Sequence, residues 1–200
     1  MWALVESGSV SKIYTHPKQL TIGDVNYPSN IFTMWSASEL EAIGIYEIVI
    51  DNTNYKNPEY YNNTNQTFDF ADGTVTASYG TATARPLDDV LWEDGDSDIP
   101  AGKSVGDVKT SGIRQGHIDR INAQAAGNLS PTDWMVVRAA EGGTAVPSSI
   151  TTKRAAVRTK ANAMCTQITN AANVDALAAL YEYNDAEPPV RPLGELPLVG

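Results

Sequence analysis

PLDDVLWEDGDSDIPAG, residues 86–102, separates two halves of the sequence that differ in texture. Six carboxylates fall within eleven residues of this segment, a proline stands near each end, and no hydrophobic period is visible. This composition is typical of an extended connector. We therefore predict a domain boundary here, with a β-rich domain at 1–85, an acidic linker at 86–102 and a helical domain at 103–185.

Short hydrophobic runs in the first half are paired around turn residues. ALVE and SKIY flank Gly8, LTI and VNY flank Gly23-Asp24, and TFDF and TVTASY flank Ala71-Asp72-Gly73. Such pairs predict antiparallel hairpins. One short helix at 37–43 interrupts them, because Ser36 and Glu39 have capping-box spacing, and the strand IYEIVI follows.

The segment 52–66 is rich in Asn and Tyr and predicts an exposed loop or hairpin tip. Its tyrosines, Tyr55, Tyr60 and Tyr61, are candidates for surface recognition of a sugar or a protein, since the ring offers rigid area and a polar end. The alternative is that they fasten the loop to its own sheet. Both interpretations remain open at this point.

Beyond the connector the hydrophobic period becomes helical. A first helix, interrupted by glycines, is predicted from about Val105 to Gly127. The longest helix, 149–170, has a seam along one face that closes on neighbouring helices or, less commonly, on a second copy of the chain. The seam residues are Ile150, Arg154, Val157, Ala161, Met164, Ile168 and Ala171.

Two further helices complete this domain. Asn173 is placed to cap a last helix that ends near 183, and residues 186–200 hold four prolines and predict an extended tail. Between the long helices lies SPTDWMVVRAAEGG, 130–143, with Ser130 as N-cap, Pro131 in the first turn and Gly142 at the end. Its apolar residues cover most of the circumference, which predicts burial on several sides. The fold class is therefore α+β, with an N-terminal domain of antiparallel hairpins and a C-terminal bundle of three or four helices.

The overall charge bears on the class of partner. The chain carries 14 Lys and Arg against 24 Asp and Glu, a net charge of −10, which argues against binding to nucleic acid. No run of about 18 apolar residues is present, so no membrane span is expected, and the N-terminus lacks the pattern of a secretion signal.

Residue types that could carry catalysis or bind a metal are scattered along the sequence. His16 and His117 have no metal-ligating or catalytic neighbours in the sequence, and Cys165 falls in an Ala-rich helical pattern that favours a small core residue. Asp94, Asp96 and Asp98 have the first spacings of a calcium loop but lack its Gly and its closing Glu. We expect neither an enzyme nor a cofactor or metal, while weak cation binding by DGDSD stays open.

Two segments resemble proteins encoded beside bacteriophage tail-fibre genes. The first is PKQLTIGDVNYPSNIFTMWSASELEAIGIYEI, 17–48, and the second is LSPTDWMVVRAAEGGTAVPSSITTKRAAVR, 129–158. The second is similar to the T-D-W-x-x-x-R…G…P…R-x-x-x-R pattern of phage tail-fibre assembly and tail-component proteins. Where that pattern often has an aromatic residue this chain has Thr151-Thr152-Lys153, which leaves the packing partner of Trp134 open.

The resemblance implies a structural protein of a phage tail, in the baseplate, tip or fibre, that acts through protein contacts and needs no cofactor. The matched positions are Asp133, Trp134, Arg138, Arg154 and Arg158. Because Arg154 and Arg158 lie one turn apart, we expect this pair to hold the short helix against the long one by stacking on the indole or pairing with a carboxylate.

The expected partners are other tail proteins and further copies of the chain, which meet at the long helix or the Pro-rich tail; a glycan of the host surface is a further candidate. The chain would be made in the bacterial cytoplasm and kept in the virion tail. Two alternatives are an assembly chaperone that is absent from the virion and a host-recognition module that binds or cleaves carbohydrate.

Overall fold

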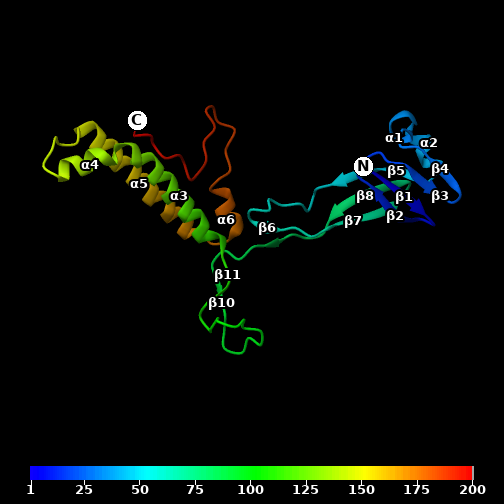
Figure 1. Ribbon diagram of the computed structural model, residues 1–200, viewed down its shortest axis with the longest axis horizontal. Coiled ribbons are helices and arrows are strands. Elements are labelled where there is room, and N and C mark those ends of the chain that lie inside the picture. Colours follow the sequence, from blue (N-terminus) through cyan, green and yellow to red (C-terminus); the bar gives the residue numbers. More distant parts are fainter. Residues whose placement is uncertain (200) are drawn as a thin grey trace. The chain divides into compact units, whose positions relative to one another are not determined.

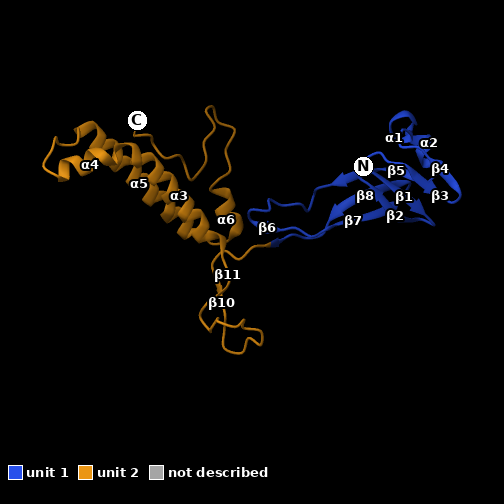
Figure 2. Cartoon of the chain, in the orientation of Figure 1, with its two compact units in different colours: residues 1–83 blue, residues 84–200 orange. Residues whose placement is uncertain are grey.

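The computed structural model describes residues 1–199 and divides into two compact units, Met1–Thr83 and Ala84–Gly200 (Figure 2). The first unit is built from strands and two short helices, and the second is mainly helical (Figure 1). The α+β class predicted from the sequence is confirmed.

Unit 1 is built on a five-stranded sheet in the order β2-β1-β5-β8-β7. Neighbouring strands are antiparallel except β5 and β8, which run parallel. The edge strands β2 and β7 approach each other, so the sheet is curled. The strands are β1 (Trp2–Glu6), β2 (Ser9–Tyr14), β5 (Ile45–Asp51), β7 (Gln66–Ala71) and β8 (Thr74–Tyr79).

The three hairpins predicted from the sequence are confirmed. β1 and β2 pair around Gly8, β3 (Leu20–Ile22) and β4 (Val25–Tyr27) pair around Gly23, and β7 and β8 pair around Gly73. At the last turn Asp72 has φ 50° and Gly73 has φ 75°, the two left-handed residues that tight hairpins favour. The parallel contact of β5 with β8 has no local signal in the sequence.

The sheet of unit 1 has a hydrophobic cluster on each face. One contains Ala3, Ile48, Val75 and Ala77; the other contains Leu4, Tyr14, Leu20, Ile31, Phe32, Leu40 and Ile45. Helices α1 (Ile31–Met34) and α2 (Ala37–Glu41) contribute to the second cluster. The predicted capping box of α2 is confirmed: Ser36 N donates to Glu39 Oε2 at 2.8 Å, and this bond lowers the pKa of Glu39.

The segment 52–66 is predicted as an exposed loop or hairpin tip, and residues 52–58 are exposed, but its second half is paired and partly buried. β6 (Tyr61–Asn62) pairs with β9 (Thr83–Ala84), and the Asn63 amide both accepts from the backbone of Lys56 and donates to it. Tyr60 and Tyr61 are buried. Asn side chains therefore supply turn hydrogen bonds here, while two tyrosines take the place of missing aliphatic residues.

Unit 2 is organised by two long helices, α3 (Ile113–Leu129) and α5 (Ser148–Asn170), which lie side by side (Figure 1). The predicted seam of α5 is buried from Arg154 to Ala171. From α3, Ile113, His117, Ile121 and Ala125 face inward at a spacing of four residues. α6 (Val174–Ala179) begins at the predicted cap, where the Asn173 side chain accepts from Ala176 N at 2.8 Å. Within residues 1–199 no helix has the length and apolar character needed to cross a bilayer.

The acidic segment 86–102 is not the extended connector that the sequence predicts. β10 (Val90–Leu91) pairs with β11 (Val108–Thr110), so residues 86–112 form a hairpin, which we call the acidic hairpin. The first helix accordingly begins at Ile113 rather than near Val105. A Cβ at Gly112 would collide with the backbone of Asp88, so this position requires glycine at the base of the hairpin.

The Pro-rich C-terminal segment also differs from the predicted extended tail. Over its described residues, 186–199, it returns to unit 2 and buries Leu193 and Val199. Lys160 Nζ donates to Leu193 O at 2.8 Å, and Asn128 Nδ2 donates to Pro197 O at 3.3 Å. The helical unit therefore uses this segment as part of its own core.

Arg114 fastens three parts of unit 2 together. Its Nη1 donates to the carbonyls of Ile168 and Thr169, both at 2.6 Å, and its Nη2 donates to Ala171 O at 3.0 Å. Its Nε and Nη2 also hold the Asp88 carboxylate, at 2.6 and 3.2 Å. All five guanidinium N–H groups are thus used, and the carbonyl end of α5 is capped by a cation from α3.

Replacing Arg114 should destabilise unit 2 more than replacing Asp88. Arg114→Met leaves three helix-terminal carbonyls without their charged donor, which should cost about 2–4 kcal/mol. Asp88→Asn removes only a largely exposed charge and should cost less than about 1 kcal/mol. Thermal melting followed by helical circular dichroism measures both changes, and equal melting temperatures for the two variants would contradict the capping role.

The contribution of the Asp88 charge should also depend on pH in one direction. The hydrogen bonds from Arg114 lower the pKa of Asp88, so its carboxylate stabilises the folded state above the unfolded pKa of about 3.9. That stabilisation is lost as the pH falls through the lower folded pKa. The difference in unfolding free energy between wild type and Asp88→Asn should be constant near neutral pH and shrink below about pH 4, as denaturant titrations at each pH can show.

Candidate protein-binding site

The end of α3 determines how the following short helix is placed. Pro131 has no N–H, so α3 ends at Leu129 and gives way to the single 3-10 turn η1 (Ser130–Thr132) and then α4 (Asp133–Ala140). Ser130 is not the N-cap that the sequence predicts, because its hydroxyl donates back to Gly127 O at 3.0 Å. We call residues 130–158, from η1 through the first turns of α5, the helical tip.

Arg154 connects α5 to the corner between α3 and α4, which η1 forms. Its Nη1 donates to Leu129 O at 2.7 Å and to Thr132 Oγ1 at 2.5 Å, and its Nη2 donates to Asp133 Oδ1 at 2.7 Å. The side chain is almost wholly buried, whereas that of Asp133 is about half exposed. Arg154 therefore satisfies the last carbonyl of α3 and fixes the start of α4 through one guanidinium group.

Arg158 does not share this role, although the sequence predicts that the two arginines act as a pair. It is exposed, and among residues 1–199 no hydrogen bond or ion pair is found for its side chain. Only Arg154 lies in the buried seam of α5, at the seven-residue spacing from Ala161 and Ile168. One turn of displacement thus brings Arg154 inside and leaves Arg158 at the surface.

Trp134 and Arg138 lie together on α4. The Arg138 guanidinium carbon lies 4.8 Å from the centre of the Trp134 ring, so the neighbour of this indole is Arg138 rather than Arg154 or Arg158. The helix ends in a Schellman motif, because Gly143 N donates to Arg138 O at 3.0 Å, Gly142 N donates to Ala139 O at 3.2 Å, and Gly142 has φ 85°. The glycine stop predicted from the sequence is present.

The apolar face of α4 is open to solvent, which corrects the prediction that it is buried on several sides. No residue of α4 is buried, and Trp134, Val136 and Val137 are 54%, 43% and 55% exposed. The helical period correctly identifies apolar residues, but it does not show whether another element covers them. An exposed group of large apolar side chains on one short helix is typical of a contact surface.

A groove of about 280 Å³ adjoins this face. It is lined by Val136 of α4, Val146 of the following loop, and Thr151, Arg154 and Arg158 of α5. Its walls are aliphatic and its charged groups are guanidinium groups, of which Arg154 is already paired with Asp133. The groove therefore offers Arg158 to an apolar, anionic partner.

The tyrosine cluster does not form a comparable surface. Tyr60 and Tyr61 are buried, and Tyr55 stacks against Tyr79 with ring centres 4.9 Å apart. The structure thus does not bring the three candidate tyrosines together on the surface. Unit 1 has a small pocket of about 200 Å³ lined by Trp2, Trp35 and Leu40 among others. The Trp2 ring packs against the core, since its centre lies 4.8 Å from the centre of the Phe32 ring.

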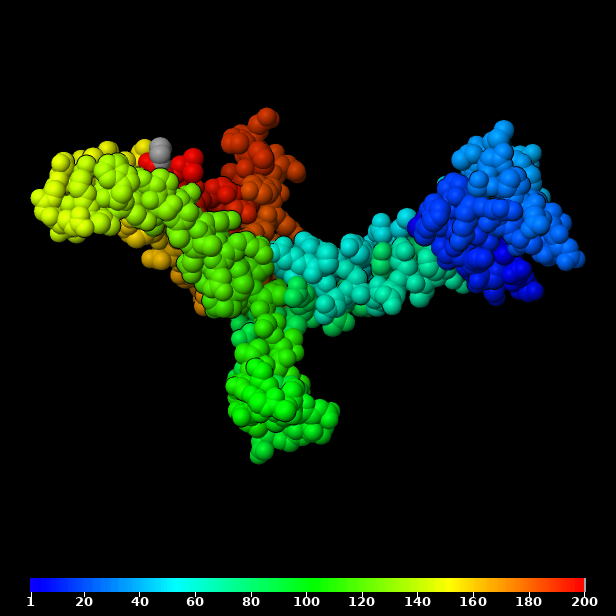
Figure 3. Space-filling view, in the orientation of Figure 1, coloured from blue at the N-terminus to red at the C-terminus, as the bar shows by residue number. Residues whose placement is uncertain are grey.

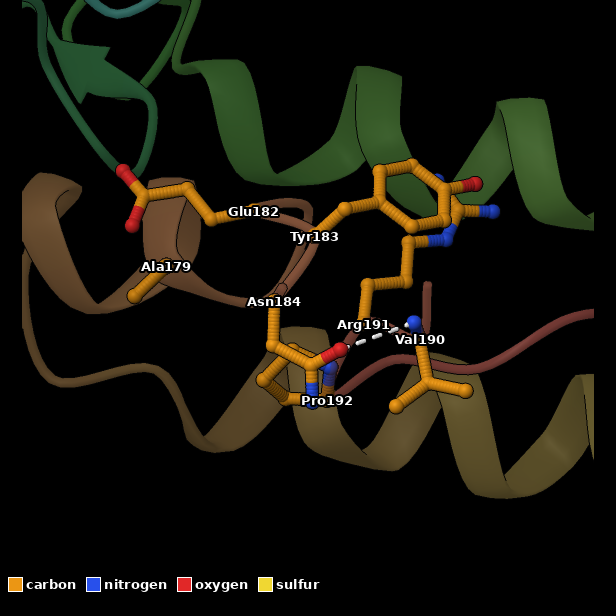
Figure 4. A pocket seen from close by; sticks show the side chains of 7 residues that line it. All are labelled: Ala179, Glu182, Tyr183, Asn184, Val190, Arg191 and Pro192. Carbon is orange, nitrogen blue, oxygen red and sulfur yellow. Dashed lines mark hydrogen bonds between the residues drawn. The ribbon is translucent and has the colours of Figure 1, made fainter. Parts of the chain in front are cut away.

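A wider hollow in unit 2, about 490 Å³, lies beside the turn at 184–190 (Figure 4). The Asn184 side-chain Oδ1 accepts from Val190 N at 3.0 Å and shapes this turn. Tyr183 donates to Glu195 at 2.6 Å and Arg191 pairs with the same carboxylate at 2.8 Å, so the polar groups are engaged with each other. We interpret this hollow as the surface of a structural turn.

The other residues that the sequence suggests for metal binding or catalysis lie in separate parts of the chain. In the acidic hairpin Asp96 accepts from Glu93 N at 3.0 Å and from Lys109 Nζ at 2.8 Å, contacts that lower its pKa. Burial raises the pKa of the Cys165 thiol. His117 is buried against Tyr181 and His16 is exposed. Within residues 1–199 no three His, Cys, Asp or Glu side chains are grouped as metal ligands.

Comparisons of this chain with models of protein families, with characterised proteins and with solved structures find no match. A functional conclusion therefore rests on the geometry of the helical tip.

The two arginines of α5 should separate structural from surface roles. Arg154→Met removes the donor of Thr132 Oγ1 and Asp133 and leaves Leu129 O with only the Thr132 hydroxyl, which should cost about 2 kcal/mol, a loss of roughly 5–10 °C in melting temperature. Arg158→Met should change the melting temperature by less than roughly 2 °C, because it removes an exposed side chain. If the Arg158 variant melted as early as the Arg154 variant, the assignment of roles would be wrong.

Proposed function

We propose that this chain is a structural component of a bacteriophage tail, in the baseplate, tail tip or fibre, and that it acts by binding other proteins. The observation that carries the proposal is the exposed apolar face of α4, formed by Trp134, Val136 and Val137 beside the Arg158 groove. Large aromatic and aliphatic side chains next to an arginine are the composition that protein interfaces favour.

The resemblance of segment 129–158 to tail proteins supports the same conclusion. Three of its matched residues now have distinct roles: Arg154 and Asp133 build the corner, and Trp134 presents its ring to solvent. A pattern that keeps a corner rigid and an indole exposed is suited to assembly rather than to bond-making. We accordingly propose no enzymatic activity and no cofactor, and a location in the virion tail after synthesis in the bacterial cytoplasm.

Oligomerisation belongs to the same proposal. The sequence favours contacts at the long helix or the Pro-rich tail, but α3 covers the seam of α5, and Leu193 of the tail is buried within the unit. The surface left for a further copy or another tail protein is α4 with its groove. The host-glycan alternative is less favoured, since Tyr60 and Tyr61 are buried.

Mass spectrometry of purified virions tests this proposal. We expect peptides of the chain at a fixed ratio to the major tail proteins after particles are banded by density and washed in high salt. A chain that is abundant in the infected lysate but absent from washed particles would support the assembly-chaperone alternative and overturn the structural role. Loosely bound protein is excluded by adding the purified chain to particles that lack it and repeating the wash.

A further inference from the structure

The helical tip and the acidic hairpin are separate protrusions of unit 2. Figure 3 shows the hairpin in green and the tip in yellow-green to yellow, at different ends of the helical body. The hairpin joins α3 at Ile113 and the tip begins after Leu129, so the 17 residues of α3, roughly 25 Å of helix, separate them. One chain cannot place its own hairpin on its own tip.

These two protrusions carry opposite charge. Residues 86–112 contain seven carboxylates and two lysines, a net charge of −5, whereas residues 130–158 contain four basic and two acidic residues, a net charge of +2. Within the hairpin Glu93, Asp94 and Asp98 are exposed, and no ion pair is found for them among residues 1–199. At the tip Arg158 is an exposed cation that lines the groove.

Both protrusions also expose aliphatic side chains. The hairpin presents Val90, Leu91, Val105 and Val108, each 39–55% exposed, and the tip presents Trp134, Val136 and Val137. A two-stranded hairpin has too few strands to bury its own side chains. Each protrusion therefore has the combination that the other needs: apolar area to cover and charge of the opposite sign.

We propose that the acidic hairpin of one copy docks on the helical tip of a second copy. In this contact the hairpin carboxylates meet Arg158, and the hairpin valines and Leu91 cover the exposed face of α4. The inference rests on the proposed function, since it names a partner for the surface that we assign to assembly. Because a negatively charged chain otherwise repels its own copies, this pair of patches determines where two copies meet.

Such a contact joins different surfaces of the two copies. A head-to-tail interface of this kind leaves one free hairpin and one free tip, so further copies add until a ring closes or a filament extends. Rings and filaments are the forms in which tail parts surround an axis, which links the charge pattern to the proposed role.

Light scattering on the purified full-length chain tests the contact. At high protein concentration and low salt we expect a mass at least twice the 21.5 kDa of the single chain, which returns to 21.5 kDa as salt rises to about 0.5 M. Arg158→Glu should give the single-chain mass at low salt without a change in melting temperature. Lys18→Glu, the same charge change at an exposed residue of unit 1, should associate like wild type.

A complementation experiment fixes the direction of the contact. Asp94→Arg should also give the single-chain mass, because it reduces the negative charge of the hairpin from −5 to −3 and replaces an exposed carboxylate with a cation that repels Arg158. Mixing this variant with Arg158→Glu should restore a mass of about two chains, since each mixture contains one intact hairpin and one intact tip.

Three results would overturn the inference. Wild type that stays at the single-chain mass at low salt excludes it, and so does an Arg158→Glu variant that associates as wild type does. Association that is lost in Arg158→Glu but kept in Asp94→Arg indicates a tip-to-tip contact instead. None of these results affects the virion test: a chain that is monomeric in solution yet present in washed particles overturns the hairpin contact alone.

Discussion

The helical unit depends on Arg114, the residue at which the acidic hairpin, the start of α3 and the end of α5 meet. A helix ends with carbonyl groups that lack an internal partner and carry partial negative charge, and burying them against another element requires a donor. Arg114 supplies it to Ile168, Thr169 and Ala171 and at the same time holds Asp88. The same group therefore sets the helix pair in register and closes the base of the hairpin.

At the opposite end of the helix pair Arg154 has the same role, but the donor and acceptor helices are exchanged. Here α5 provides the cation and α3 provides the carbonyl, Leu129 O. The seam between these ends includes Ala125 and Ala161, whose small side chains bury little apolar area. Because this part of the helix pair buries little apolar area, the polar contacts at its two ends help to specify the register of α3 against α5.

The sequence predicts those features of this fold that arise from neighbours in the chain. Hairpins around Gly8 and Gly73 and the seam of α5 follow from turn chemistry and local period. The sequence does not predict the acidic hairpin, because its base depends on Gly112 lying against Asp88, a contact across 24 residues that leaves no periodic pattern. At the candidate site both arginines of α5 match the same motif, yet only Arg154 shares the seven-residue spacing of the seam, a signal already present in the sequence. The exposure of α4 could not be predicted, since a helical period shows that a face is apolar but not what covers it.

An eight-residue helix such as α4 is too short to be stable by itself, and none of its residues is fully buried. Contacts at its two ends stabilise it: Arg154 fixes Asp133 at the start, and the Schellman motif at Gly142 closes the last turn. Because neither end uses the apolar face, Trp134 and Val137 are held in position without being covered. A partner that docks there binds side chains that folding has already ordered. Binding then loses little further conformational entropy, which favours tight association for a small contact area.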